Sequence, residues 1–158
     1  MGLGYDIHCL ALGCNLWLGG VKIPHTKGAV GHSDADTLIH ALCDALLGAA
    51  ALRDIGYHFP DTSQEFKGID SKILLKKVMA LITDKGFYVV NVDATVIIQQ
   101  PRLANYIPLM VSTLSGIMNM PTDNVNIKAK TAEKLGAVGE EKGVEAQVIV
   151  LLAKTDNL

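Results

Sequence analysis

The chain has 158 residues, of which 49% are hydrophobic and 19% are charged, and its formal net charge is −2 at pH 7. This length suits a single domain spanning residues 1–158, and the near-neutral charge excludes a broad basic surface for nucleic acid. A mean hydropathy of +0.29 is high for a small soluble domain. It indicates either a buried subunit interface or a dense aliphatic core.

Cysteine usage and the apolar runs indicate the compartment. The chain has three cysteines and no Cys-x-x-Cys pair: Cys9, Cys14 and Cys43. This odd count, with no basic and apolar leader in residues 1–20, predicts reduced thiols and a cytoplasmic protein. The longest apolar run, residues 42–52, is interrupted by Asp44 and Gly48 and is too short to span a bilayer, so we expect no membrane association.

Residues 3–10 alternate in polarity, as expected for a strand. Asp6 and His8 lie two residues apart and therefore share one face of it, while Cys9 points to the other face. Two ligands at positions i and i+2 of a strand converge on one point. A short hairpin is expected next, at residues 16–24.

Residues 34–52 are predicted to form a helix, with Ser33 or Asp34 as its N-cap. Three polar residues recur at every fourth position and share one face of this helix: Asp36, His40 and Asp44. A lone histidine on an apolar helix is usually a satisfied core residue. The Asp-x-His pair on the strand favours instead the interpretation of His40 as a metal ligand. Asp36 or Asp44 would then accept a hydrogen bond from the second ring nitrogen of His40.

Asp6, His8 and His40 together supply one carboxylate and two imidazoles. A catalytic zinc ion commonly takes three protein ligands and leaves its fourth position open. We therefore expect a catalytic metal centre rather than a structural one. Cys43 is a rival ligand on the same helix, although a buried cysteine more often serves as a small hydrophobe.

The remaining elements complete the expected fold. They are a polar loop at 53–70, helices at 71–85 and 105–118, and strands at 87–99, 124–130 and 144–153. Alternation in the 87–99 strand places Val90 on the face of Val92, and Val89 on the opposite face. With the first strand, these elements predict an α+β fold: a mostly antiparallel or mixed four-stranded sheet with helices on one face. The free face is apolar enough to pack on a copy of itself.

Four further segments carry groups that could bind phosphate or nucleotide, and each has an ordinary structural alternative. Residues 32–33 precede a helix N-terminus, which binds anions or is simply capped. Segments 54–56 and 59–62 are binding loops or plain turns. Residues 99–102 could offer backbone groups to a nucleobase or merely connect two elements. Residues 130–134 combine a hydroxyl, a carboxylate and an ammonium, which could bind a Mg²⁺–phosphate unit or form solvated surface.

Together and in this order, these segments resemble the 2-C-methyl-D-erythritol 2,4-cyclodiphosphate synthase family of the non-mevalonate isoprenoid pathway. The most specific stretch is Ser-Asp-Ala-Asp-Thr-Leu-Ile-His-Ala-Leu-Cys-Asp-Ala-Leu at 33–46. It is supported by Gly-Tyr-Asp-Ile-His at 4–8, Leu-Gly-Ala-Ala-Ala-Leu at 47–52, Asp-Ile-Gly at 54–56, Phe-Pro-Asp-Thr at 59–62 and Glu-Lys-Leu-Gly at 133–136. The resemblance covers nearly the whole chain.

The resemblance implies a lyase that assembles as a homotrimer of packed sheets, with active sites at the subunit interfaces. In the implied reaction, the 2-phosphate of 4-diphosphocytidyl-2-C-methyl-D-erythritol 2-phosphate attacks the β-phosphorus and releases CMP and the cyclic diphosphate. It also implies Zn²⁺ on Asp6, His8 and His40. A Mg²⁺ or Mn²⁺ ion on Glu133 would bridge the α- and β-phosphates of this cytidine nucleotide substrate.

By position, the resemblance also assigns the other site residues. His32 and Thr131 would stabilise the transition state, and residues 98–104 would cradle cytosine. The implied substrate-binding set is Asp6, His8, His32, Ser33, Asp54, Ile55, Gly56, Phe59, Pro60, Asp61, Thr62, Ser63, Ile98, Gln99, Gln100, Pro101, Arg102, Leu103, Ala104, Lys130, Thr131, Ala132 and Glu133. A loop at 57–70 would close over the substrate and exclude water.

Three positions depart from the family pattern. Lys130 stands where the family often has a small hydroxyl residue, and Ala137 and Glu140 stand where many members have Phe and Arg. Two other hypotheses remain. A zinc-dependent nucleotide phosphohydrolase would share the metal set but admit water. A non-catalytic metal- and nucleotide-binding trimer would have no need for the hydroxyl, imidazole and carboxylate of the reaction site together.

Overall fold

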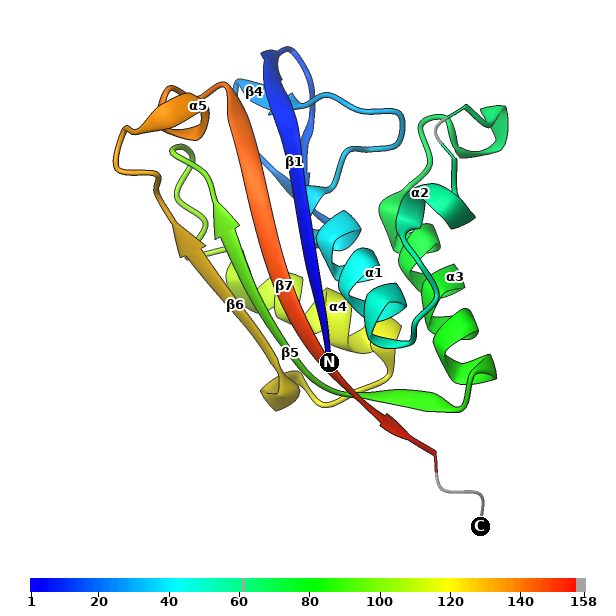
Figure 1. Ribbon diagram of the computed structural model, residues 1–158. Helices are drawn as coiled ribbons and strands as arrows, with labels where there is room; N and C mark the ends of the chain where they lie inside the picture. The colour runs from blue at the N-terminus through cyan, green and yellow to red at the C-terminus, as the bar shows by residue number, and fades with distance from the viewer. Residues whose placement is uncertain (61, 156–158) are drawn as a thin grey trace.

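The computed structural model describes residues 1–60 and 62–155 (Figure 1). Within these residues the main sheet has five strands in the order β4-β1-β7-β5-β6. They are β1 Gly2–Leu12, β4 Lys27–Ala29, β5 Phe87–Ile97, β6 Val125–Lys130 and β7 Gly143–Lys154. β5 and β6 run parallel, while the other neighbouring pairs are antiparallel. The predicted α+β class with a mixed sheet is confirmed.

The predicted number of strands is wrong, because the prediction omitted β4. This strand has only three residues and pairs with the far end of β1, where Leu10 lies opposite Ala29. Three residues are too few to give an alternation pattern. The hairpin expected at 16–24 is present as a separate two-stranded sheet of β2 Leu16–Leu18 and β3 Val21–Ile23.

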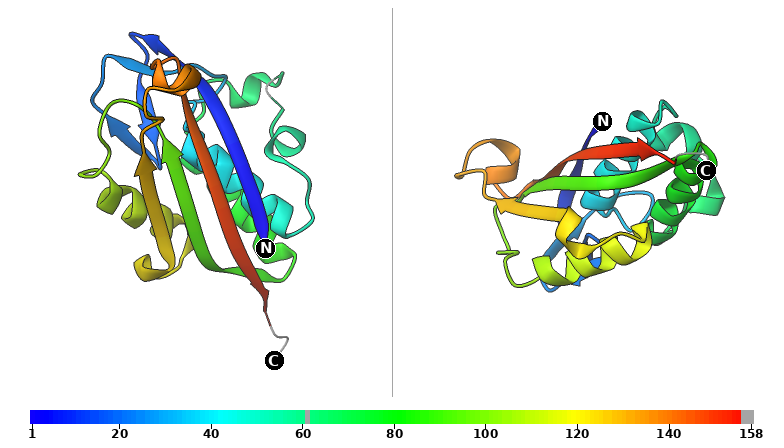
Figure 2. Two further views of the ribbon diagram at one scale, coloured as in Figure 1. Left: turned by 60° about the vertical axis from the view of Figure 1, so that its left-hand side comes forward. Right: turned by 90° about the horizontal axis from the view of Figure 1, so that it is seen from below.

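Three long helices cover one face of the main sheet (Figure 2). They are α1 Thr37–Ala49, α3 Ser71–Asp84 and α4 Ile107–Met118, as predicted to within a few residues. Their apolar stripes join the inner face of the sheet in one core, which includes Leu42, Leu75 and Leu114. The expected polar loop contains two short helices, α2 Ile55–His58 and the 3-10 turn η1 Gln64–Phe66.

Two more short helices lie outside that loop, the 3-10 turn η2 Thr122–Asn124 and α5 Gly136–Gly139. Across residues 1–60 and 62–155, no helix has the length and apolar character needed to cross a membrane.

The start of α1 is fixed by Asp36, and the caps predicted at 33–34 are wrong. The Asp36 carboxylate accepts the backbone N–H of Ile39 at 3.0 Å. It also accepts the N–H groups of Gly19 at 2.9 Å and Gly20 at 2.7 Å in the β2–β3 turn. Burial nevertheless raises the pKa of this carboxyl. Asp36 therefore ties the hairpin to the helix start and is not available to a histidine.

One face assignment on β5 is also wrong. The register of β5 on β7 shifts between Val89 and Asn91, so the strand carries a bulge. An extra residue reverses the alternation on one side of a bulge. Val89 is accordingly buried and Val90 only half-buried, whereas Val92 faces the core as predicted.

The sheet face away from the helices is exposed and partly apolar. Five large side chains on β1 and β7 are between 41% and 68% exposed there: Leu3, Tyr5, Ile7, Ile149 and Leu151. Toward β6 the exposed side chains are polar, and Asp93 accepts hydrogen bonds from Asn126 at 2.8 Å and Lys128 at 2.7 Å. A contiguous apolar patch on a small protein marks an interaction surface.

β1 packs directly on the backbone of α1. A Cβ atom at Gly4 would lie 1.8 Å from the carbonyl oxygen of Ala41, and one at Gly2 would lie 2.0 Å from that of Ala45. No side chain larger than hydrogen fits at either position, so these glycines set the distance between strand and helix.

We expect Gly4→Ala to destabilise the protein by about 2–3 kcal/mol, because the helix backbone must move to admit the methyl group. Gly48→Ala is the matched control, since a Cβ atom added at this exposed glycine on α1 would meet no heavy atom within 4 Å. That substitution should be neutral or stabilising by up to about 1 kcal/mol. Urea unfolding measures both, and equal stability of Gly4→Ala and the wild type would contradict the close packing.

Candidate metal centre and active site

Asp6, His8 and His40 converge on one point, as predicted. Asp6 and His8 project from the same face of β1, and His40 projects from α1. Their ligand atoms all lie within 4.8 Å of one another. The Oδ2 atom of Asp6 is 2.9 Å from Nδ1 of His8 and 3.3 Å from Nδ1 of His40.

The surroundings of Asp6 fit a bound cation. Its Oδ2 atom is buried and makes no hydrogen bond of acceptable geometry, although two imidazole nitrogens are close. A buried carboxylate oxygen without a partner is costly unless a cation compensates for its charge. One carboxylate oxygen and two imidazole nitrogens are a ligand set typical of first-row divalent metals. The three side chains therefore form a site that fits a divalent metal ion.

The charges at this centre influence one another. Burial favours a higher pKa for Asp6, but the adjacent His40 and His8 imidazoles outweigh burial and hold that pKa below its usual value. Burial favours a lower pKa for His40, but the nearby carboxylates, Asp6 foremost and then Asp36 and Asp34, outweigh burial and raise it. The Asp6 carboxylate thus stays ionised and attracts a proton or a metal ion toward the two rings.

Cys43 does not belong to this ligand set. It is fully buried in the core, and burial raises the pKa of its thiol well above the usual value. A protonated buried thiol is a poor ligand, because metals bind the thiolate. Cys9 is exposed on β1, on the face opposite to the two ligands. The interpretation of Cys43 as a small buried hydrophobe is confirmed.

A pocket of about 550 Å³ opens onto the ligands. Besides Asp6, His8 and His40, its lining includes seven residues of the predicted substrate set: His32, Ser33, Ile55, Gly56, Phe59, Pro60 and Thr62. Asp54 does not line it but caps α2 by accepting the N–H of Tyr57 at 2.8 Å. The predicted residue Asp61 lies outside the described residues.

The turn before α1 and the loop before α3 are joined beside this pocket. Nε2 of His32 lies 3.0 Å from the carbonyl oxygen of Ser63, and the N–H of Gly68 donates to the carbonyl of His32 at 2.7 Å. The predicted residue Ser63 thus contacts His32 through its backbone. Phe66, Ile69 and other lining residues were not predicted, because their apolar side chains gave no functional signal in the sequence.

Neither predicted acceptor, Asp36 nor Asp44, holds His40. Asp44 accepts the N–H of Ile55 at 2.7 Å and so anchors α2 beside the pocket, and burial raises its pKa. Nε2 of His40 lies 2.9 Å from Oγ of Ser71 and 3.1 Å from Oγ of Ser33. Ser71 was missed because a serine at a helix start resembles a cap, and no spacing relates it to His40.

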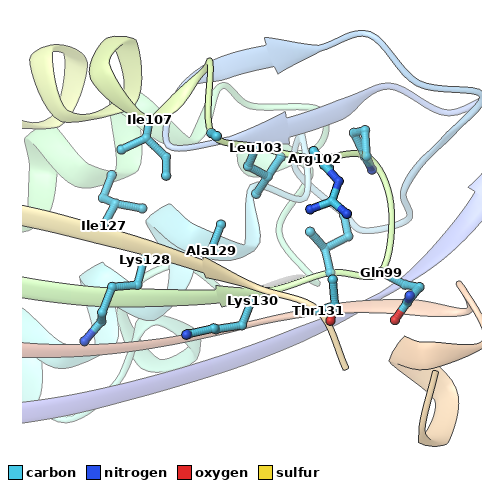
Figure 3. Close-up of a pocket in the computed structure, with 12 residues that line it drawn as sticks. Gln99, Arg102, Leu103, Ile107, Ile127, Lys128, Ala129, Lys130 and Thr131 are labelled. Carbon is cyan, nitrogen blue, oxygen red and sulfur yellow. The ribbon is translucent and has the colours of Figure 1, made fainter. Parts of the chain in front are cut away.

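A second pocket, of about 370 Å³, lies at the opposite edge of the sheet, between β6 and α4 (Figure 3). Its lining includes every residue of 98–104 except Gln100, and also Lys130 and Thr131, all of which belong to the predicted substrate set. Figure 3 shows Ile107 and Ile127 facing each other across the apolar side of the pocket. Arg102 and Thr131 lie at its other end, near the loop that follows β5. Lining residues in helices and strands, such as Ile127, were not predicted, because an apolar side chain in such an element is expected in the core whether or not it lines a pocket.

Ala132 and Glu133 lie beside the second pocket rather than in its lining. The Thr131 hydroxyl donates to Oε1 of Glu133 at 2.8 Å, and the N–H of Lys134 donates to Oε1 of Gln99 at 3.2 Å. The loop after β6 is therefore tied to the loop after β5. The carboxylate of Glu133 is exposed and remains available on this rim.

The two pockets share no residue, and β7 lies between them. The register aligns Asp6 with Ala146 and Ala146 with Val96, so both pockets open at the same end of the sheet. β1 and β6 are three strand spacings apart, which is about 14 Å.

The fold and the site define a class: an α+β protein in which three residues that fit a divalent metal ion face a pocket, as in metal-dependent enzymes. The chain belongs to the YgbB family, whose model matches residues 1–153.

Several relatives are similar over nearly their whole length. The chain is 54% identical to the 2-C-methyl-D-erythritol 2,4-cyclodiphosphate synthase of Bacteroides thetaiotaomicron, over 98% of the chain and 97% of the relative. It is also 54% identical to that of Nitrosomonas europaea, over 100% of the chain and 97% of the relative. The chain is accordingly a cyclodiphosphate synthase, a lyase of isoprenoid biosynthesis.

Solved structures agree with this assignment. A cyclodiphosphate synthase with CDP bound matches with a TM-score of 0.89 and 38% identity, over 96% of this chain and 99% of that chain. The bifunctional IspDF protein of Campylobacter jejuni matches with a TM-score of 0.93 and 38% identity, over 97% of this chain and 42% of that chain.

A divalent metal ion should stabilise the folded protein. At a free concentration one hundred times its Kd, it should add about 2.7 kcal/mol to the free energy of unfolding, read as a higher Tm that EDTA reverses. His40→Ala should abolish this shift. Cys43→Ala should lower the basal Tm by opening a cavity but keep the metal-induced shift. Loss of the shift in Cys43→Ala, or its survival in His40→Ala, would show that the ligand set is wrong.

Proposed function

We propose that this chain, as one catalytic domain in the cytoplasm, converts 4-diphosphocytidyl-2-C-methyl-D-erythritol 2-phosphate into the 2,4-cyclodiphosphate and CMP. A 2-phosphate oxygen forms a bond to the β-phosphorus, and the bond from that phosphorus to the bridging oxygen breaks, so that CMP leaves with the oxygen. The proposal rests on one observation above all: the Asp6–His8–His40 centre opens into a pocket that His32 and Ser33 line, in a chain of this family.

The metal at this centre is proposed to be Zn²⁺, one per chain, because three protein ligands beside an open pocket are the arrangement typical of catalytic zinc sites. When bound, the ion supplies positive charge that offsets the repulsion between the reacting phosphates. Ser33 and the backbone at 54–56 would hold the methylerythritol phosphate end. His32 would donate from its ring to a phosphate oxygen after exchanging its contact with Ser63.

The second pocket is proposed to hold the cytidine end of the substrate. Apolar walls with a few polar groups at the rim suit a nucleobase, and backbone groups of residues 98–104 would meet its edge. Thr131 would stabilise charge at the phosphates. Glu133 would hold a Mg²⁺ or Mn²⁺ ion together with the α- and β-phosphates, as a carboxylate that the Thr131 hydroxyl already orients.

A homotrimer is proposed to bring the metal pocket of one subunit next to the nucleotide pocket of another. In one chain the metal pocket and the nucleotide pocket share no residue and lie on either side of β7. Packing the exposed apolar sheet face on two copies would bury Tyr5, Ile7 and Ile149. Each active site would then combine the metal pocket of one subunit with the nucleotide pocket of the next.

The reaction is tested by phosphorus NMR after incubation with the cytidylyl substrate, Zn²⁺ and Mg²⁺. Cyclic diphosphate and CMP in equal amounts are expected. Linear phosphates would instead establish the alternative, a zinc-dependent nucleotide phosphohydrolase, because water would have replaced the internal nucleophile. Unchanged substrate that stays bound would indicate a non-catalytic binding protein.

Glu133→Gln should remove most turnover and its dependence on Mg²⁺, yet retain zinc, because Glu133 is expected to contact only the phosphate-bound ion. Glu140→Gln is the control, since Glu140 is an exposed carboxylate that pairs with Lys142 outside both pockets. That variant should keep wild-type turnover. Activity and zinc content are measured on the same samples, and equal loss of both in Glu133→Gln would show that its role is misplaced.

Light scattering at micromolar concentration should report about three times the 16.9 kDa chain mass. Ile149→Glu should dissociate the assembly, because it would bury three unpaired charges at the proposed interface. Leu109→Glu, at a 57% exposed position on α4, should leave the mass unchanged. A wild-type monomer with full activity would contradict the proposed arrangement.

A further inference from the structure

Ser71, the first residue of α3, lies between a metal ligand and a carboxylate. It is fully buried, and its Oγ atom is 2.9 Å from Nε2 of His40. The same hydroxyl is hydrogen bonded to Oδ1 of Asp34, whose Oδ2 accepts the N–H of Ser71 at 3.0 Å. The N–H of Asp34 in turn donates to the carbonyl of Ile69 at 3.0 Å. One carboxylate therefore fixes both the backbone and the side chain of Ser71.

The chemistry of these groups sets the direction of each hydrogen bond. A carboxylate only accepts, so the single hydroxyl proton of Ser71 goes to Asp34. The Ser71 oxygen can then only accept from His40, which places the imidazole proton on Nε2. His40 is left with a bare Nδ1, which is the nitrogen 3.3 Å from Oδ2 of Asp6. The lone pairs of this nitrogen and this oxygen repel each other at such a distance, and a cation between them would remove the repulsion.

We propose that Asp34 and Ser71 are positioning residues that fix the tautomer and the ring orientation of His40, so that Nδ1 is its metal-binding nitrogen. The inference rests on the metal centre of the proposed function and extends it to residues outside the ligand set. Ser71 is buried and does not line the substrate pocket, so its effect passes through His40.

Ser33 is the other hydroxyl that contacts His40, and its surroundings differ. Its Oγ atom is 3.1 Å from Nε2 of His40 and accepts the N–H of Ala35 at 3.1 Å. It is partly exposed and lines the pocket, where a phosphate group can take its hydroxyl. The Ser71 contact is shorter and shielded from water, so we expect it to persist when the substrate binds.

The hydrogen-bonded chain from His40 through Ser71 to Asp34, here called the relay, also joins the N-terminal ends of two helices. Asp34 lies in the turn before α1, and Ser71 begins α3. The metal ligand, the turn that carries His32 and the loop that carries Ser63 are therefore held in one hydrogen-bonded unit. Loss of either relay residue should loosen the metal site before it unfolds the core.

The test measures Zn²⁺ affinity by competition with a chromophoric chelator, on otherwise intact protein. Ser71→Ala removes the acceptor, and zinc binding should weaken about 10- to 100-fold. Asp34→Asn should give a similar loss, because its amide can donate to Ser71 and turn the hydroxyl toward Nε2 of His40. The double variant should bind no more weakly than Ser71→Ala alone, since both changes break one relay.

Ser33→Ala is the matched control, because it removes the other hydroxyl that contacts the same nitrogen. It should keep zinc affinity within about threefold of the wild type while altering substrate binding. Cobalt(II) substitution adds a spectroscopic signature: the visible absorption bands should shift in Ser71→Ala and Asp34→Asn but not in Ser33→Ala. Circular dichroism of the metal-free proteins separates these effects from misfolding, and Asp34→Asn alone carries the comparison if Ser71→Ala does not fold.

Wild-type zinc affinity and an unshifted cobalt spectrum in both relay variants would overturn the inference while leaving the metal centre intact. So would fully additive losses in the double variant, because they would assign Asp34 and Ser71 to separate roles. A wild-type protein that binds no zinc would instead refute the proposed metal centre itself.

Discussion

The backbones of β1 and α1 touch with no side chain between them at Gly2 and Gly4. This contact brings two ligands from a strand within reach of a third from a helix, since Asp6 and His8 follow the glycines on the strand face that His40 approaches. The rest of the centre depends on that spacing, because moving the strand away from the helix would also move Asp6 and His8 away from His40. The close packing of β1 on α1 therefore also positions the three proposed metal ligands.

Polar residues around this contact hold the site in a region that is largely buried. Asp36 fixes the start of α1, and Asp44 anchors α2 beside the pocket. Asp34 joins α1 and α3 through Ser71. Each carboxylate accepts backbone N–H groups from another segment, which is how buried charges are retained in proteins. The apolar core supports the sheet, while these acidic groups position the loops that enclose the proposed reaction.

The sequence predicted what depends on local spacing. The i, i+2 pair on β1 and the apolar helix around His40 gave the ligand set, and alternation gave the long strands. β4 was missed because three residues carry no period, and Val89 was assigned to the wrong face because a bulge leaves no mark in the sequence. Ser71 was missed for another reason: its contact with His40 spans 31 positions and exists only in the folded chain.

The central claim is that Asp6, His8 and His40 hold one metal ion per chain. Anomalous scattering at the zinc edge from crystals of the zinc-loaded protein tests it most directly. We expect one peak per chain, bonded to a carboxylate oxygen of Asp6 and to one ring nitrogen of each histidine at about 2.0–2.2 Å. A peak at Cys43, or no peak after zinc loading, would contradict it.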